Sequence, residues 1–507
     1  MKRIRPYSLI ITFIVTLLFY TVQLKAQPET SSGLKLDVKE HVLKNGLKVL
    51  MIEKHDVPIF SAILTYKVGS VNEHPGITGV SHLLEHMMFK GTKLFGTKDY
   101  EAEEPIIKKI DKLELQLIEE KAKGKGADTE KIKKIEDELA KLFEKQREYI
   151  VADEMWSIYL RYGGTGLNAS TANDNTNYYV SLPSNKLELW AFIESDRMQN
   201  LVLREFYPER DVVMEERRLR TENSPFGLFI EQLNAVSFIA HPYSWPVVGW
   251  RSDIQNITKE QTLEYFKRYY APNNAVISIV GDINPEEVIS IIEKYFGNIP
   301  SQPAPPAVIT VEPEQLGERR VYIEFDANPQ LAVAYHKPAI GHPDQYVLEV
   351  IEAVLSHGRT SRLYKSMVEE KRIAVSARAY AGLAKYPDTF TFFLTPRQPH
   401  TIDEVEAALY EEIDKLKATP PTEWELQKIK NQLEADFIRS LESVTGLAGE
   451  IAYYEAIYDW GYINTLVDNI KAVTAEDVMR VANQYFTKNN RTVAILVKKE
   501  KATENKQ

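Results

Sequence analysis

The 507-residue sequence predicts an α+β protein of two homologous α/β-sandwich domains, with a helical hairpin inserted in the first domain. Three observations support this fold class. Strand-like and helix-like segments alternate along most of the chain. Residues 258–280 align without gaps with 474–496 and 209–216 with 425–432, which indicates an internal duplication. Residues 104–155 interrupt the first repeat with a heptad pattern.

The N-terminus has the pattern of a secretory signal peptide at residues 1–26. The basic stretch MKRIR precedes an apolar run that is short for a bilayer-spanning helix, and a small residue, Ala26, stands at the expected cleavage point. We expect cleavage there and an exported, periplasmic protein. The alternative is an uncleaved segment that anchors the chain in the inner membrane, and the sequence suggests no other membrane association.

The composition is typical of a soluble globular protein, with 44% hydrophobic and 26% charged residues. The net charge of −10 and the lack of a basic patch interleaved with aromatic residues argue against a nucleic-acid partner. The sequence contains no cysteine, so it forms no disulfide. Any metal must therefore be held by histidines and carboxylates.

Changes in composition predict the domain boundaries. We expect an N-terminal domain at 38–296, a Pro-rich linker at 297–313, and a C-terminal domain at 314–498. The charged residues 499–507 are predicted to form a disordered tail.

The insertion at 104–155 is predicted to form an antiparallel helical hairpin. Its two heptad runs, Ile106 to Leu117 and Ile132 to Tyr149, are apolar along a narrow seam and charged elsewhere, and KGKGAD separates them. The simpler interpretation is a hairpin that packs on itself and its domain. A docking arm for a partner is the alternative.

The segment HLLEHMM predicts a helix with two chemically different faces. His82, Glu85 and His86 share one face, with the two imidazoles about one turn apart, and the opposite face is apolar, formed by Leu83, Leu84, Met87 and Met88. Two neutral imidazoles at this spacing can converge on one zinc ion. The order H-x-x-E-H is an inverted zincin signature. We therefore favour a metal site over a core helix that happens to carry histidines.

A catalytic zinc needs a third protein ligand and an open position, and PERDVVMEERR supplies candidates. On a helix, Glu209, Val212, Val213 and Glu216 share one stripe, and the arginines of this segment point elsewhere. Carboxylates inside an apolar stripe are costly to bury unless they bind something. A solvated charged helix is the alternative interpretation, and we favour ligation for Glu216.

Together these motifs resemble the pitrilysin (insulinase) family of zinc metallopeptidases, including its bacterial two-domain members and the β subunit of the mitochondrial processing peptidase. GLNASTANDNTNYYVSLP, HPYSWPVVGW and YYAPNNAVISIVGDINPEEV also match, in family order. The resemblance implies one Zn²⁺ per chain, held by His82, His86 and Glu216. It also implies that Glu85 is the general base on a water whose pKa the zinc lowers to about 7.

The resemblance extends to two further parts of the site. It implies that Glu209 is a catalytic-site residue that supports the ligands, and that Asn168 and Ala169 lie on an edge strand that pairs with extended substrate. In the second repeat, Gln432 stands at the position of Glu216 and there is no histidine pair near 350–356. The second half is therefore expected to be a degenerate copy that cannot bind zinc in this way.

The family resemblance also predicts a partner. Two such domains form half of a clamshell, so the other half must come from a second subunit, which in complete assemblies supplies an Arg and a Tyr seven residues apart. The matching positions here are Glu369 and Ser376, although Tyr380 lies nearby. A carboxylate would repel the oxyanion that develops during peptide hydrolysis. We expect a heterodimer with a related subunit that lacks zinc ligands and carries the Arg/Tyr pair.

The function predicted from the sequence is that of an exported zinc-dependent endopeptidase, which hydrolyses extended peptides or unfolded polypeptide segments. The alternative is a non-catalytic peptide-binding or scaffold subunit of the same fold.

Overall fold

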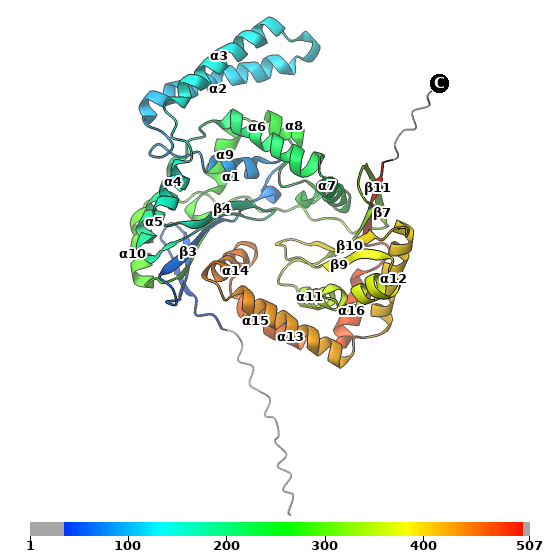
Figure 1. Cartoon of the computed structure of the whole chain (residues 1–507). Helices are drawn as coiled ribbons and strands as arrows, with labels where there is room; N and C mark the ends of the chain where they lie inside the picture. The colour runs from blue at the N-terminus through cyan, green and yellow to red at the C-terminus, as the bar shows by residue number, and fades with distance from the viewer. Residues whose placement is uncertain (1–34, 500–507) are drawn as a thin grey trace, which may run out of the picture.

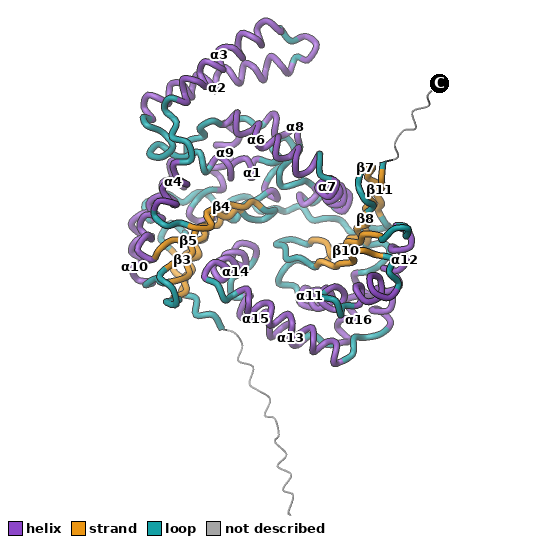
Figure 2. Tube along the Cα trace, viewed as in Figure 1, coloured by secondary structure: helices purple, strands orange, loops and turns teal. Residues whose placement is uncertain are grey.

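The computed structural model describes residues 35–499. It has two β-sheets with helices packed on them, and these form two similar halves arranged as an open half-shell (Figures 1 and 2). The predicted signal peptide at 1–26 and all but the first residue of the predicted tail at 499–507 lie outside this range. None of the described helices is long and apolar enough to cross a membrane.

The first sheet has six strands. In spatial order they are β1 (Lys39–Val42), β2 (Lys48–Glu53), β6 (Ala275–Gly281), β3 (Ile59–Tyr66), β5 (Thr176–Pro183) and β4 (Thr165–Thr171). β2 and β6 are parallel and the other pairs are antiparallel, and β4 is an edge strand. The helices of this half are α1 (Val80–Met87), α4 (Glu154–Arg161), α5 (Leu187–Asn200), α6 (Phe206–Arg217), α7 (Pro225–Ser237), α8 (Arg251–Asn256), α9 (Lys259–Tyr269) and α10 (Pro285–Phe296).

The second sheet repeats this topology without the strand that corresponds to β1. Its order is β7 (Arg319–Phe325), β11 (Arg491–Lys498), β8 (Gln330–Lys337), β10 (Asp388–Pro396) and β9 (Ala374–Tyr380), again with one parallel pair, β7 and β11. Its helices are α11 (Pro343–Ser356), α12 (Ile402–Ala418), α13 (Glu423–Ser440), α14 (Val444–Ile457), α15 (Tyr462–Ala472) and α16 (Ala475–Tyr485).

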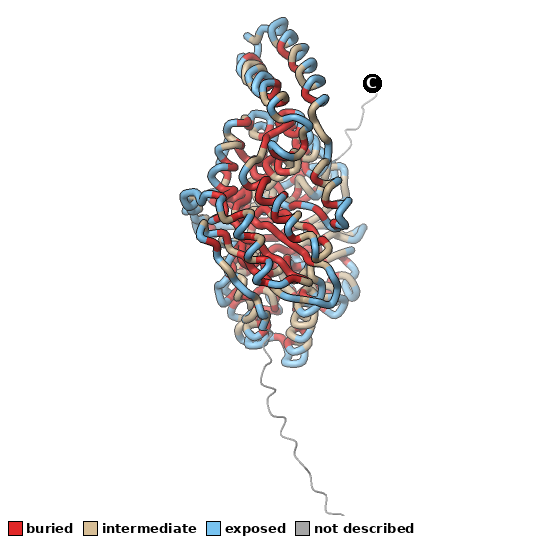
Figure 3. Tube along the Cα trace, turned by 90° about the vertical axis from the view of Figure 1, so that its left-hand side faces the viewer, coloured by how far each residue is buried: buried red, intermediate tan, exposed pale blue. Residues whose placement is uncertain are grey.

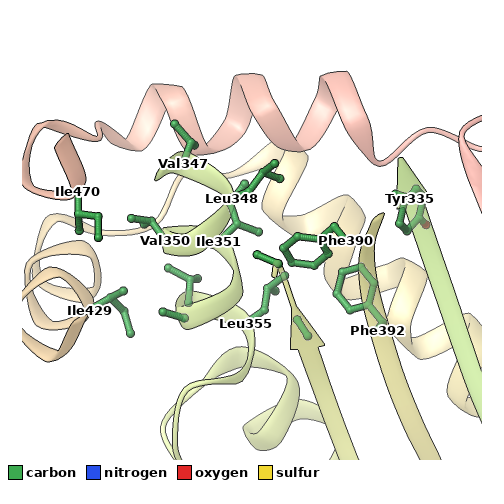
Figure 4. Packing of buried hydrophobic residues seen from close by; sticks show 14 of the residues in the cluster. Tyr335, Val347, Leu348, Val350, Ile351, Leu355, Phe390, Phe392, Ile429 and Ile470 are labelled. Atoms are coloured by element: carbon green, nitrogen blue, oxygen red, sulfur yellow. The ribbon is translucent and has the colours of Figure 1, made fainter. Parts of the chain in front are cut away.

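The predicted duplication is confirmed at the level of single elements. The aligned segments fold as α9 followed by β6 and as α16 followed by β11. Both helices begin with a threonine capping box, at Thr258 and at Thr474, because a Thr hydroxyl satisfies an amide that the first turn leaves unpaired. The α11 helix packs its apolar face on Phe390 and Phe392 in the core of the second half (Figure 4).

The two halves exchange one helix each. α14 of the second half lies against β3 and β6 of the first sheet, and α7 of the first half lies against β7 and β11 of the second sheet (Figure 1). One buried cluster therefore includes both Ile63 of β3 and Ile451 of α14. This exchange joins the repeats into one body, since neither sheet is covered on both faces by its own half alone.

The inserted segment forms the predicted antiparallel pair, α2 (Tyr100–Ala122) and α3 (Thr129–Arg147), which projects from the body and is largely exposed (Figures 1 and 3). Its seam is less purely apolar than predicted. Glu103 is fully buried and pairs with Arg204 at 2.8 Å. Arg204 also donates to the backbone carbonyls of Lys90 and Thr92, so the base of the hairpin supports the loop after α1.

Candidate metal centre

The start of helix α1 is fixed by a glycine, Gly79, and by a buried carboxylate, Glu73. Gly79 has φ of 91°, and a Cβ there would lie 2.5 Å from the carbonyl of Val248, so only glycine fits. The buried carboxylate of Glu73 accepts hydrogen bonds from the amides of Gly79 and Ser81, both at 2.8 Å. Glu73 thus satisfies amides that the helix cannot satisfy itself. Glu73 was not identified from the sequence.

The two predicted faces of α1 are confirmed. On the apolar face, four side chains are fully buried: Leu83, Leu84, Met87 and Met88. His82, Glu85 and His86 are only partly buried and line a cavity of about 730 Å³. The apolar face fixes the rotation of the helix, and this rotation turns the three polar side chains into the cavity.

The helix α6 faces α1 and carries Glu209 and Glu216. The predicted stripe was wrong in part. Val212 is 50% exposed, whereas Arg210 and Arg217 are buried. The side of α6 that packs inward is therefore rotated toward these arginines, which reach hydrogen-bond partners on other segments, such as the carbonyl of Ile257 for Arg210.

His82, His86 and Glu216 form the one group of three or more potential metal ligands within the described residues, with donor atoms within 4.8 Å of one another. Glu216 Oε2 lies 3.3 Å from His86 Nε2 and 3.7 Å from His82 Nε2. Two ligands bound at 2.0–2.1 Å to a tetrahedral zinc lie about 3.4 Å apart. The donor set and its spacing therefore fit a zinc ion.

The electrostatics of this group favour a bound cation. Burial and the neighbouring His86 lower the pKa of His82, which favours the neutral imidazole that a metal binds. Burial also lowers the pKa of His86, but Glu209 and Glu216 outweigh it and raise that pKa to about 9. The two carboxylates thus create a site that stabilises positive charge.

Glu209 orients His86 through the imidazole nitrogen Nδ1. Its Oε1 lies 2.8 Å from His86 Nδ1, and its Oε2 lies 2.6 Å from Lys90 Nζ. A carboxylate on one imidazole nitrogen leaves the other nitrogen, Nε2, to face the metal position. Lys90 was not identified from the sequence, because its approach to Glu209 depends on the packing of α1 against α6.

Glu85 is held by the edge strand β4. Thr171 Oγ1, at the end of β4, donates to Glu85 Oε2 at 2.6 Å. Burial raises the pKa of Glu85, and this hydrogen bond partly offsets the effect. Thr171 was missed as a site residue, although it belongs to the motif that contains Asn168 and Ala169.

Asn168 and Ala169 lie on the edge strand β4 and line the same cavity as the three candidate ligands. Asn168 is exposed, and its Oδ1 accepts a hydrogen bond from the amide of Ala169 at 2.9 Å. An incoming strand would have to replace this local bond. The arrangement fits the predicted edge-strand pairing in position.

Comparisons with known proteins show to which family this chain is similar. A family model described as "Insulinase (Peptidase family M16)" matches residues 48–116, and one described as "Peptidase M16 inactive domain" matches residues 256–433. The chain is 30% identical over 461 residues to the zinc protease PqqE of Helicobacter pylori, with 90% of this chain and 91% of that protein covered. The chain belongs to peptidase family M16. The expected family resemblance is thereby confirmed.

Other M16 relatives match most of this chain, although not all have the same length. The chain is 24% identical to the probable mitochondrial-processing peptidase subunit beta of Schizosaccharomyces pombe, with 87% of each chain covered. A crystal structure of a protease from Helicobacter pylori has a TM-score of 0.77 at 29% identity, covering 91% of this chain and all of that one. The periplasmic protease PqqL from Escherichia coli shares the fold at 17% identity and a TM-score of 0.69, and this chain corresponds to 48% of its length.

The motif HPYSWPVVGW, which had no assigned role, joins the site to the second domain. The buried Tyr243 donates from its hydroxyl to Asp174 at 2.7 Å, on the turn between β4 and β5. Asp174 also accepts from the amide of Lys385, in the second half. The predicted linker is fixed nearby, because Glu312 accepts hydrogen bonds from the amides of Ile239, Ala240 and His241.

Proposed function

We propose that this M16 chain is an exported zinc endopeptidase that cleaves extended peptides or unfolded segments. The observation that carries the proposal is the convergence of His82, His86 and Glu216 beside a carboxylate, Glu85, that is not one of the three donors. A zinc ion held there would supply Lewis acidity and lower the pKa of a ligating water to about 7.

The protein residues around this position have separate tasks. Thr171 occupies Oε2 of Glu85, which leaves Oε1 to take a proton from the attacking water and pass it to the leaving amine. Glu209 fixes the imidazole of His86. Replacing Glu209 with Gln should lower turnover by about 10–100-fold, the usual cost of losing such support. Normal activity of Glu209→Gln would remove Glu209 from the site.

The edge strand β4 predicts whether folded or unfolded substrates are cleaved. A substrate that adds a strand at Asn168 and Ala169 is recognised through main-chain hydrogen bonds, which a folded globule cannot offer. Unfolded casein-like substrates should be cut and a stable folded protein spared. Equal cleavage of both would count against the edge-strand model.

The proposal includes a partner subunit. Glu369 is exposed in the π-helical segment Tyr364–Glu370, and Ser376 on β9 lies 3.2 Å from Thr395 through their hydroxyls, so neither position offers an Arg or a Tyr. The relation to a processing peptidase subunit and to half of PqqL supports pairing with a second M16 subunit. Full turnover by the purified chain alone would contradict this part.

A non-catalytic scaffold of the same fold is the second candidate. The decisive experiment is zinc-dependent cleavage of a quenched peptide library by the mature protein, alone and with a sister subunit. Turnover that is lost with a chelator and restored by zinc supports the peptidase. Peptide binding without turnover in both preparations would favour the scaffold. Export is tested separately, since cleavage after Ala26 predicts a mature N-terminus at Gln27.

A further inference from the structure

The zinc-ligand candidate Glu216 has two carboxylate oxygens, and the structure gives them different partners. Oε2 faces the two imidazoles, at 3.3 and 3.7 Å, whereas Oε1 lies 2.6 Å from Nη1 of Arg220. Among the described residues that line the cavity of the metal centre, Arg220 is the only arginine or lysine.

Arg220 lies on a π-helical turn, Arg218–Glu222, that directly follows α6. The turn closes with a hydrogen bond from the amide of Asn223 to the carbonyl of Arg218, at 2.8 Å. It also packs tightly against α7, because a Cβ on Gly227 would lie 2.0 Å from the carbonyl oxygen of Arg220. Single π-turns are frequent at functional sites, and the close packing against α7 fixes the position of this one at the cavity.

The neighbouring arginines have other partners. Arg217 is buried and pairs with Glu231 at 2.8 Å, and Arg218 pairs with Glu215 outside the cavity. Arg220 alone pairs with a potential metal ligand. Its side chain is 77% exposed, so solvent screens its charge and the ion pair adds little to stability. Global stability therefore gives little reason for this contact.

We propose that Arg220 is a positioning residue that keeps Glu216 a one-oxygen ligand. This inference rests on the proposed function. A carboxylate whose second oxygen is free can turn both oxygens to a metal, but a catalytic zinc needs an open coordination position. By occupying Oε1, Arg220 leaves that position to water. Arg220 thus acts on the metal only through Glu216.

The test uses the mature protein with Arg220→Ala, Arg220→Lys and, as a matched control on the same turn, Arg218→Ala. Arg220→Ala should keep one zinc per chain and an unchanged Tm. In the Co²⁺-substituted protein its visible absorption should weaken, because Co²⁺ absorbs less strongly as its coordination number rises. Arg220→Lys should restore part of the absorption, since lysine keeps the charge but not the guanidinium fork. Arg218→Ala should match the wild type.

Turnover gives a second measurement. Arg220→Ala should lower kcat by about 10–100-fold with little change in KM. A wild-type Co²⁺ spectrum in Arg220→Ala, or loss of its zinc, would overturn the inference. The spectrum can be read even if no peptide is ever cleaved, so failure of the proposed function, seen as an inactive wild type, is distinct from failure of this positioning role.

Discussion

The two halves of the chain each have a cleft between an edge strand and the helix that packs beside it. In the first half, α1 and β4 line a cavity of about 730 Å³, and in the second, α11 and β9 line one of about 860 Å³. The buried face of α11 continues the pattern of α1, with Val350, Ile351, Val354 and Leu355 in place of Leu83, Leu84, Met87 and Met88. This pairing places Glu349 at the position of His82, Glu352 at that of Glu85, and Ala353 at that of His86.

The difference between the clefts shows which constraints survive duplication. The apolar face of each helix is buried in a hydrophobic cluster, so a change there costs packing energy. The cavity face contributes less to the core, although Ala353 is buried there, so its polar side chains can change with less loss of packing energy. The second half lacks all three candidate ligands. Glu349 and Ala353 stand at the positions of the two histidines, and Gln432 is the repeat counterpart of Glu216. The first half alone keeps a complete donor set among the described residues.

The largest effect should distinguish two equivalent glutamates, Glu85 in the first cleft and Glu352 in the second. Glu85→Gln should keep one zinc per chain and lose about 10²–10⁴-fold in turnover, because it removes a base and not a ligand. His82→Ala, His86→Ala and Glu216→Gln should lose the metal. The matched variant Glu352→Gln should leave turnover unchanged. Metal analysis with peptide cleavage measures this, and a folded but zinc-free Glu85→Gln would disprove the assigned role.

The next effect tests whether the halves are independent. Ile451→Ala on α14 should destabilise the chain by about 2–5 kcal/mol, and so should Leu233→Ala on α7, because each is buried in a cluster shared with the other half. Since the helices are exchanged, both variants should shift one common transition in calorimetry. Two separate transitions, with each variant moving only one, would show that the exchange does not couple the halves.

A smaller effect concerns Glu349, one of two glutamates that line the second cleft. Burial, with a contribution from Glu352, raises the pKa of Glu349 from 4.5 to about 7. Between about pH 4.5 and 7, the folded state therefore keeps a proton on Glu349 that the unfolded state has released. The free energy of unfolding should fall as pH rises through this range. Glu349→Gln should flatten this fall in Tm. The exposed control Glu370→Gln should retain it, and parallel profiles for wild type and Glu349→Gln would contradict the prediction.

The smallest effect is expected from the hairpin, which only the first half contains. Replacing residues 118–132 with a short Gly/Ser turn should leave zinc content unchanged. The structure restricts the removable part to the tip, because Glu103 and Asp111 near the base bind Arg204 and Lys259 of the body. Zinc loss after removal of the tip, with folding retained, would show that the whole hairpin supports the site.

The sequence by itself determined the local features of this protein. The helical period of HLLEHMM predicted which face of α1 is apolar and which carries His82, Glu85 and His86, because a 3.6-residue repeat is a property of neighbouring residues. The duplication and both heptad runs of the hairpin were likewise visible in the linear pattern. The helical stripe of PERDVVMEERR favoured Glu216 as the distant candidate ligand, and the family resemblance implied the same residue.

Tertiary structure decided which segments meet. The periodicity of α6 left open which side packs inward, so Val212 was placed incorrectly, and the buried partners of Arg210 and Arg217 on other segments explain the difference. The exchange of α7 and α14 was invisible in the sequence, because an apolar stripe shows that a helix needs a cover but not which sheet provides it. The contacts of Glu85 with Thr171 and of Glu209 with Lys90 depend on the same long-range packing.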